Sequence, residues 1–162
     1  MGAWGVSAHA GGFSVMSVRE PEDRDWSEWL RMRCALWPDD SPQEHERGMR
    51  EWRSRGDAAV FLALRANGSP CGFVEVGTRQ YADGCLTSPV GYIEGWYVDA
   101  DVRRQGIGRA LLRVAESWAR ARGYREMASD ARLDNTVSHA AHARAGYAEV
   151  ERLIVFRKSL GG

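Results

Sequence analysis

Two arginines and two glycines, Arg103, Arg104, Gly106 and Gly108, stand between an apolar strand-like run and an amphipathic helix-like run. The first N–H groups of a helix have no partner inside it, and they carry the positive end of the helix dipole. Glycines let an anion approach the main chain closely, and arginines add charged donors. The pattern therefore predicts a binding site for a pyrophosphate group at this helix start.

Other phosphate-binding motifs fit this segment less well. A dinucleotide fingerprint requires a third glycine where this chain has Leu111, and a P-loop requires Gly-Lys-Ser/Thr, which the sequence lacks. A glycine-rich loop that caps an ordinary helix is the alternative interpretation. The remaining pattern, Arg103-x-x-Gly106-x-Gly108, resembles the acyl-CoA-binding motif of the GNAT acetyltransferases.

The composition is typical of one globular domain with balanced charge. The chain has 162 residues, with 22 basic and 22 acidic side chains. This length suffices to bury a core, and the balance of charge argues against a nucleic acid or a membrane surface as partner. We expect residues 1–16 to be a disordered extension and residues 17–160 to form a single domain. Neither a transmembrane run nor a signal peptide is expected.

The cysteines and histidines favour neither disulfides nor a metal. Cys34, Cys71 and Cys85 are odd in number and lack paired spacing, which predicts reduced thiols and a cytoplasmic protein. His139 and His142 lie three apart on a predicted helix, without a third ligand nearby in the sequence. We therefore expect surface histidines and no metal site.

Hydrophobic periodicity and turn signals predict the order β-α-α-β-β-β-α-β-α-β-β, without an internal repeat. The predicted strands cover residues 17–19, 59–65, 71–78, 90–98, 126–129, 147–150 and 152–158. The predicted helices are one ending before Pro38, one starting at the capping box Ser41–Glu44, and two over residues 108–120 and 135–144. This α/β (α+β) pattern, a mixed and mostly antiparallel sheet flanked by about four helices, is similar to the GNAT acyl-CoA N-acyltransferase fold. In that fold two parallel strands splay apart around the thioester arm of acetyl-CoA.

A closer resemblance covers about residues 17 to 160. Several segments resemble the aminoglycoside 6′-N-acetyltransferases: Leu36-Trp37-Pro38, residues 81–90, Ile93-Glu94-Gly95, residues 125–130, Asn135-Thr136, Glu151-Arg152 and residues 155–158. The resemblance implies acetyl transfer from acetyl-CoA to the 6′-amino group of an aminoglycoside, and hence antibiotic resistance. It also implies a cytoplasmic homodimer.

The same resemblance implies that Trp37, Tyr81, Glu94, Asp130 and Glu151 contact the amino groups of the sugar. Carboxylates and flat aromatic walls suit a polycation. Each residue also has a structural alternative: Trp37 as a core residue, Tyr81 as loop surface and Glu94 in a salt bridge with an arginine. Asp130 could cap a loop, and Glu151 could be a solvated edge charge. By strand alternation we expect Glu94 on one face with Tyr92, Trp96 and Val98.

Asp130 is the first choice for a general base that deprotonates the acceptor amine, and Glu94 is the second. The attack would be direct, since no cysteine lies in a nucleophile motif. The resemblance implies coenzyme binding by residues of the strand, of the turn and of the last helix start: Trp96, Tyr97, Val98, Arg104, Gln105, Gly106, Ile107, Gly108, Arg109 and Asn135.

The chain departs from the broad family at His142, where many members carry a tyrosine that protonates the leaving thiolate. A histidine near its pKa could act there, or His142 could be a surface helix residue. Two other functions stay open at this stage. The acceptor could be a polyamine, another small amine or a protein N-terminus, and the domain could bind acyl-CoA without catalysis.

Overall fold

The computed structural model describes residues 17–161 and separates them into two compact units, divided in the sequence between Asp130 and Ala131. The expected disordered extension, residues 1–16, lies outside the described residues. The expected single domain over residues 17–160 stays a prediction.

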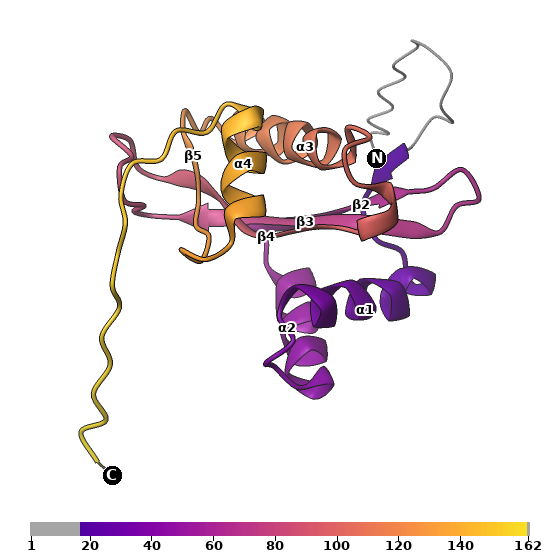
Figure 1. Ribbon diagram of the computed structural model, residues 1–162, viewed down its shortest axis with the longest axis horizontal. Coiled ribbons are helices and arrows are strands. Elements are labelled where there is room, and N and C mark those ends of the chain that lie inside the picture. Colours follow the sequence, from indigo (N-terminus) through magenta and orange to yellow (C-terminus); the bar gives the residue numbers. More distant parts are fainter. Residues whose placement is uncertain (1–16, 162) are drawn as a thin grey trace. The chain divides into compact units, whose positions relative to one another are not determined.

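The first unit is built on a five-stranded sheet in the order β1-β2-β3-β4-β5 (Figure 1). Neighbouring strands pair antiparallel, except that β4 and β5 run parallel. This confirms the predicted mixed, mostly antiparallel sheet. The strands are β1 (Ser17–Arg19), β2 (Ala58–Leu64), β3 (Pro70–Arg79), β4 (Val90–Val98) and β5 (Met127–Ser129).

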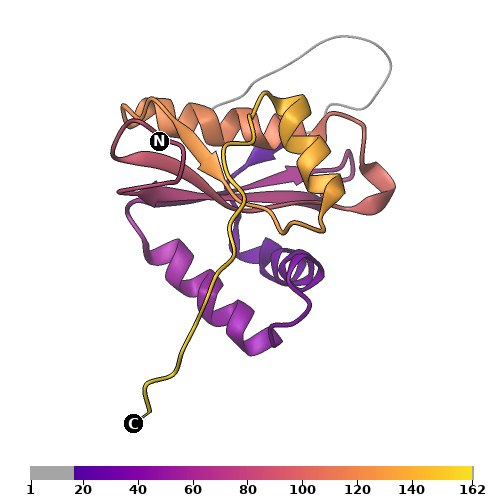
Figure 2. The same ribbon diagram turned by 60° about the vertical axis from the view of Figure 1, so that its left-hand side comes forward.

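Two helices, α1 (Trp26–Leu36) and α2 (Pro42–Ser54), cover one face of this sheet (Figures 1 and 2). The predicted capping box starts α2, because Glu44 N–H donates to Ser41 Oγ at 3.3 Å and Ser41 N–H donates to Glu44 Oε2 at 2.8 Å. The side chains buried between these helices and the sheet form the main core: Trp29, Met32, Met49, Val60, Leu62, Leu64 and Phe73.

The helix α3 (Ile107–Ala121) lies on the opposite face of the sheet (Figures 1 and 2). Its buried side chains, Leu111, Leu112, Ala115 and Ala119, recur at helical spacing as the sequence predicts. A Cβ added at Gly91 of β4 would lie 3.0 Å from the Ala119 Cβ. The absence of a side chain at Gly91 therefore lets α3 pack directly on β4.

A β-bulge interrupts β4 at Glu94. Glu75 of β3 pairs with Gly95, whereas the next residue, Val76, pairs with Ile93, so Glu94 is the extra residue of the bulge. An extra residue reverses the alternation of side chains on the two sides of it. The expectation that Glu94 shares one face with Tyr92, Trp96 and Val98 therefore holds for Tyr92, which comes before the bulge, and is wrong for Trp96 and Val98, which come after it.

The register assigns these residues to two faces. Tyr92 pairs with Gly77, where an added Cβ would meet Trp52 of α2, so Tyr92 is on the face that α1 and α2 cover. Trp96 is on the other face, since a Cβ at Gly108 of α3 would lie 2.9 Å from the Trp96 ring.

The second unit contains one helix, α4 (Thr136–Ala145), within its described part. Asn135 caps its start by accepting a hydrogen bond from Ser138 N–H at 3.0 Å, and Gly146 ends it at φ 95°. Residues 147–161 form neither helix nor strand. The strands predicted over residues 147–150 and 152–158 are therefore wrong for this chain by itself, because a strand forms only where a partner satisfies its main chain.

Candidate active site

The parallel strands β4 and β5 pair over a short stretch, which ends where β5 itself ends. Their register ends at Ile93 and Ser129, although β4 continues to Val98. The next residues on the two strands are Glu94 and Asp130, the two carboxylates that the sequence predicts for catalysis. Both acidic residues thus directly follow the last paired residues of the two strands.

After Ile93, no strand of the described chain pairs with β4 on the side where β5 lies. Some main-chain groups of β4 therefore face an open edge. Asp99 N–H donates to Cys71 O of the neighbouring segment at 2.8 Å. Main-chain groups alternate between the two sides of a strand, so Tyr97 N–H also faces β3. The same alternation directs the N–H groups of Trp96 and Val98 to the edge that β5 leaves open. Of the three predicted main-chain donors to the coenzyme, the geometry favours Trp96 and Val98.

The turn before α3, residues 103–109, is called the glycine turn below. Gly106 is the N-cap residue at φ 85°, and Arg104 has φ 63°, in the left-handed region that a non-glycine residue rarely adopts. The first hydrogen bond within the helix runs from Ala110 N–H to Gly106 O at 2.9 Å. A Cβ at Gly106 would meet no atom within 4 Å, so space for an anion is open at this helix start.

Arg103 links the glycine turn to the end of β4. Its Nε donates to Val98 O at 2.9 Å, and its guanidinium lies 5.9 Å from the centroid of the Tyr97 ring. The positively charged turn is therefore held beside the open edge of β4.

Glu94 and Asp130 belong to a set of interacting side chains, with Arg79 and Tyr92, which is called the carboxylate cluster below. Arg79 donates from Nε to Glu94 Oε1 at 2.8 Å and from Nη2 to Glu94 Oε2 at 2.6 Å. Its guanidinium carbon lies 3.4 Å from the centroid of the Tyr92 ring. Tyr92 Oη donates to Asp130 Oδ1 at 2.6 Å. The cluster joins β3, β4 and the end of β5.

The environment of Tyr92 keeps its hydroxyl protonated. The side chain is 6% exposed. Burial raises the pKa of Tyr92 far above its ordinary value, and the hydrogen bond to Asp130 raises this pKa further. Tyr92 is thus a fixed donor that orients the Asp130 carboxylate.

Trp37 lies directly after α1 and is partly buried against the main core. A Cβ at Gly95, next to Glu94, would lie 2.6 Å from the Trp37 ring. The guanidinium of Arg33 lies 4.8 Å from the ring centroid, and the Phe73 ring is 6.3 Å away. The alternative that Trp37 is a core residue therefore holds in part. Its ring also forms a wall beside the bulge that carries Glu94.

Tyr81 is 70% exposed in the loop between β3 and β4, and its hydroxyl donates to Asp83 Oδ1 at 2.9 Å. Glu126 holds the same loop, since its carboxylate accepts hydrogen bonds from Leu86 N–H at 2.9 Å and Thr87 N–H at 2.6 Å. The Thr87 hydroxyl also donates to this carboxylate. That bond has the largest effect in lowering the pKa of Glu126, and the two main-chain bonds lower this pKa further. The loop is thus fixed at one end while the Tyr81 ring is open to solvent.

The remaining predicted site residues belong to the second unit. Asn135 uses its side-chain oxygen to cap α4. His142 Nδ1 lies 2.8 Å from Ser138 O, and its ring meets the Tyr147 ring edge-on at 5.7 Å. Glu151 is exposed. The roles assigned to these residues stay predictions.

Sequence reasoning missed Arg79 and Tyr92 as members of the site. Arg79 is the last residue of β3, and an arginine at a strand end carries no signal of its own. The alternative considered for Glu94 was a salt bridge to an arginine, and the structure contains that bridge. The register of β3 with β4 places Arg79 opposite Val90, on the face that Tyr92 and Glu94 share with Val90 by alternation, and the sequence alone does not give this register.

A second Glu–Arg pair lies between the sheet and α1. Glu75 of β3 is 2% exposed and accepts hydrogen bonds from Trp29 Nε1 at 2.9 Å and from the Arg33 guanidinium. Burial raises the pKa of Glu75, and the charge of Arg33 opposes this rise. The Nε of Arg33 is buried without a hydrogen-bond partner among the described residues. Since Arg33 also stacks on Trp37, this pair supports the wall beside Glu94.

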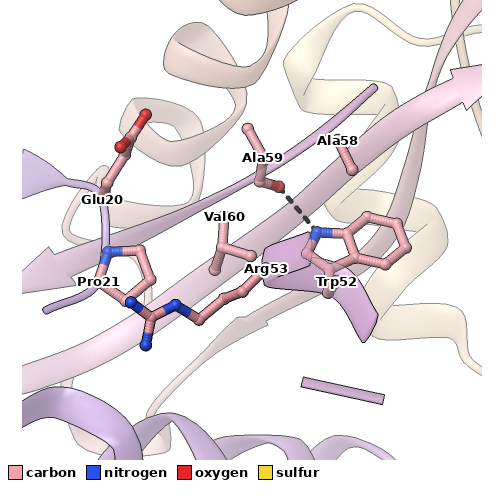
Figure 3. Close-up of a pocket in the computed structure, with 7 residues that line it drawn as sticks. All are labelled: Glu20, Pro21, Trp52, Arg53, Ala58, Ala59 and Val60. Carbon is pink, nitrogen blue, oxygen red and sulfur yellow. Dashed lines mark hydrogen bonds between the residues drawn. The ribbon is translucent and has the colours of Figure 1, made fainter. Parts of the chain in front are cut away.

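A pocket of about 280 Å³ lies elsewhere, near the start of β2 (Figure 3). Trp52 closes one side of it and donates from Nε1 to Ala59 O at 3.0 Å (Figure 3). The pocket is lined by Glu20, Pro21, Trp52, Arg53, Ala58, Ala59 and Val60. Since none of these belongs to the glycine turn or the carboxylate cluster, the pocket is separate from the candidate site.

Over residues 17–161, no cluster of three or more His, Cys, Asp or Glu side chains is arranged to hold a metal ion. The helices in the same range are too short or too polar to cross a membrane.

Comparisons with known proteins agree with this geometry. Residues 24–147 match the model of the Acetyltransferase (GNAT) family. An aminoglycoside N(6′)-acetyltransferase type 1 from Klebsiella aerogenes is 46% identical over 146 residues, covering 88% of this chain and 96% of that protein. A protein of the same name from Stenotrophomonas maltophilia is 41% identical over 149 residues, covering 91% of this chain and 95% of its own length.

Solved structures give the same result. The crystal structure of aminoglycoside antibiotic 6′-N-acetyltransferase AAC(6′)-Ih from Acinetobacter baumannii has a TM-score of 0.85 and 36% identity, and the match covers 91% of this chain and all of that one. The structure of AAC(6′)-Iy in complex with a bisubstrate analogue, CoA-S-monomethyl-acetylneamine, has a TM-score of 0.85 and 33% identity, and it covers 90% of this chain and 99% of the other.

Proposed function

The chain belongs to the GNAT acetyltransferase family, and we propose that it transfers the acetyl group of acetyl-CoA to the 6′-amino group of aminoglycoside antibiotics. One observation carries the proposal. Two carboxylates, Glu94 and Asp130, directly follow the end of the pairing between β4 and β5, and the same strand β4 leads into the glycine turn. A site for a polycation is thus next to a site for a pyrophosphate.

The acceptor amine must lose a proton before it attacks the thioester. A primary amine with a pKa near 10 is about three units too basic at pH 7, so deprotonation costs roughly 4 kcal/mol. Asp130 is our candidate for the base, since Tyr92 holds its carboxylate in place. Glu94 attracts the ammonium group and is the second candidate for the base. A positioned base contributes typically about 10²–10⁴-fold to the rate.

Open space at Gly106 and the N–H groups of the helix start suit the pyrophosphate of the coenzyme. The N–H groups from Gly106 to Arg109 would bind the pyrophosphate, and the open edge of β4 at Trp96 and Val98 would bind the pantetheine arm. Acetyl-CoA supplies an activated acyl group, and the chain supplies its orientation toward the carboxylate cluster. We retain His142 as a candidate acid for the leaving thiolate and Asn135 as a candidate contact of the coenzyme.

The test is acetyl-CoA turnover with a panel of acceptors, followed by mass spectrometry and NMR of the products. Kanamycin and tobramycin are expected to be acetylated on the 6′ amine, whereas spermine and peptides are not. Acetylation at another amine would refute the regiochemistry but not the fold. Turnover on polyamines alone would support the second acceptor class, and coenzyme binding without any turnover would favour a non-catalytic domain.

We further propose that the protein is a homodimer. Residues 147–161 form no strand within the described chain, yet several apolar side chains there are exposed, among them Ile154 at 77%, Val155 at 89% and Phe156 at 87%. A second copy would cover such a segment. Light scattering after size exclusion should give twice the mass of the chain, and Phe156→Asp should give monomers. Leu86→Asp, at an exposed loop residue, is the control that should leave the mass unchanged.

We place the enzyme in the cytoplasm and its physiological effect in aminoglycoside resistance. The odd number of cysteines, Cys34, Cys71 and Cys85, and their lack of paired spacing support a reducing compartment. Expression in a susceptible bacterium should raise the inhibitory concentration of tobramycin. The Asp130→Asn variant, expressed to the same level, should not.

A further inference from the structure

Arg79 is not needed to hold β3 and β4 together, because the ladder between these strands already pairs eight residues of each. Its guanidinium instead reaches from the last residue of β3 to the bulge residue Glu94. Both carboxylate oxygens of Glu94 accept a hydrogen bond from it, at 2.8 Å and 2.6 Å. This planar, two-point contact is the strongest geometry that an arginine and a carboxylate can adopt.

The rest of the Arg79 environment also suits a cation. The guanidinium carbon lies 3.4 Å from the centroid of Tyr92, whose hydroxyl donates to Asp130. A cation above an aromatic ring is attracted by the negative face of that ring. Glu94, Asp130 and the Tyr92 ring are therefore all arranged around one positive group that belongs to the chain itself.

A protonated amino sugar would bind the same groups as Arg79, namely the carboxylates and the Tyr92 ring. Its ammonium groups are cations with several N–H donors, and they bind carboxylates and aromatic faces. The side chains of Arg79 and Glu94 are 42% and 27% exposed, so the pair is open to water and to a competing cation. Because solvent and salt reach both partners, another cation can compete with the guanidinium for Glu94.

We propose that Arg79 is a specificity-determining residue that occupies the ammonium site of the free enzyme and must give up Glu94 when a cationic acceptor binds. The inference rests on the proposed function, because it assigns Glu94 to the acceptor. Arg79 lowers the net negative charge of the cluster from two to one in the free enzyme. Weakly charged amines therefore compete poorly for Glu94, whereas a polycation displaces the guanidinium.

The test compares Arg79→Met with the unchanged protein in steady-state kinetics on tobramycin. The KM for tobramycin should fall about three- to tenfold with kcat nearly unchanged, because a competing cation has been removed from the binding site. The fall should shrink as salt is added, since the lost interaction is between exposed charges. A KM that rises, or a fall that salt does not alter, would overturn the proposal.

Two further variants exclude a general effect of charge or folding. Arg50→Met on α2 removes an arginine that pairs with Glu46 at 2.8 Å and lies 5.9 Å from the Trp26 ring, and it should leave the KM unchanged. In a Glu94→Gln background, Arg79→Met should no longer lower the KM, because the group for which it competes is gone. An equal effect in both backgrounds would show that Arg79 does not act through Glu94.

Binding measurements separate this inference from the proposed function. Calorimetric titration of tobramycin into the unchanged protein and into Arg79→Met needs no turnover. If neither protein acetylates tobramycin but Arg79→Met binds it more tightly, the proposed reaction fails and the role of Arg79 stands. If both turn over tobramycin with the same affinity, the reaction stands and the role of Arg79 is refuted. Arg79→Gln replaces Arg79→Met in every arm if the methionine variant does not fold.

Discussion

The glycine turn and the carboxylate cluster are made from different parts of the chain. The turn uses the main chain of consecutive residues, with Arg104 and Gly106 in the left-handed region just before α3. The cluster uses side chains of β3, of β4 and of Asp130 directly after β5, and the pairing of these strands brings them together. One site is therefore a local conformation, whereas the other is a product of tertiary packing.

This difference has a functional consequence. Main-chain donors present the same face to any anion, so the turn suits the invariant part of a coenzyme. Side-chain carboxylates can differ from protein to protein without a change of fold, so the cluster suits the variable acceptor. Substitutions in the two regions should accordingly affect coenzyme and acceptor separately.

The strongest test of this separation is Asp130→Asn. Asparagine keeps the size of the side chain but cannot accept the proton, so kcat should fall about 100-fold or more. Acetyl-CoA affinity, measured by calorimetry, should stay as it is, because the glycine turn is untouched. The control is Asp134→Asn, at an exposed residue that pairs with Arg132 at 3.5 Å. Full activity of Asp130→Asn would remove this residue as the base.

A comparison of two Glu–Arg pairs tests whether the cluster serves stability or binding. Glu75→Ala leaves the Arg33 charge buried and Trp29 without its acceptor, so the free energy of unfolding should fall by about 3–5 kcal/mol. Glu94→Ala breaks an exposed pair and should cost less than about 1 kcal/mol. Urea unfolding measures both.

The two glutamates should show the opposite order in binding. Glu94→Ala should lower the affinity for tobramycin. Glu75→Ala, measured at a temperature where the variant is folded, should keep an affinity closer to that of the unchanged protein. Equal losses of stability in the two variants would mean that Glu94 is a structural residue.

The same contrast explains how much the sequence could predict. The glycine turn, the capping box at Ser41 and the bounds Val90–Val98 of β4 follow from neighbouring residues, and the structure contains all three. The bulge does not follow, because Glu94 is displaced only by the way β4 pairs with β3. The contact between Arg79 and Glu94, fifteen positions apart, does not follow either, because the register of β3 with β4 sets it.

The C-terminal segment, residues 147–161, also shows that the sequence does not predict contacts with distant partners. Its run of apolar residues, which includes Val155 and Phe156, predicts a strand, but the chain by itself leaves them exposed. Propensity describes what a segment favours once a partner is present, and it does not supply the partner. The sequence therefore predicted elements well where their partners are local and poorly where they are not.

The glycine turn can be disturbed without touching the cluster. Gly106→Val forces a β-branched residue into φ 85° and puts a side chain into open space at the helix start. We expect the acetyl-CoA affinity to fall about tenfold or more, and the stability to fall by about 1–2 kcal/mol. Gly68→Val imposes the same strain at φ 83° in a hairpin and should change stability only. Coenzyme affinity that is equal in the two variants would contradict a role of this turn in binding.

Tyr92→Phe should have the smallest effect, and it probes the one hydrogen bond that orients the candidate base. Loss of that bond to Asp130 should lower kcat about two- to tenfold, with acetyl-CoA affinity unchanged.

Tyr92→Phe should also change how the stability of the protein depends on pH. Burial, and then the bond to Asp130, raise the pKa of Tyr92 in the folded protein above the ordinary value of about 10. Below that pH the phenol is protonated in both states, and above it the unfolded state ionises first, so Tyr92 makes stability fall as the pH rises. The free energy of unfolding should therefore decline less steeply above about pH 10 in Tyr92→Phe than in the unchanged protein, and equal slopes would show that Tyr92 is not a buried donor.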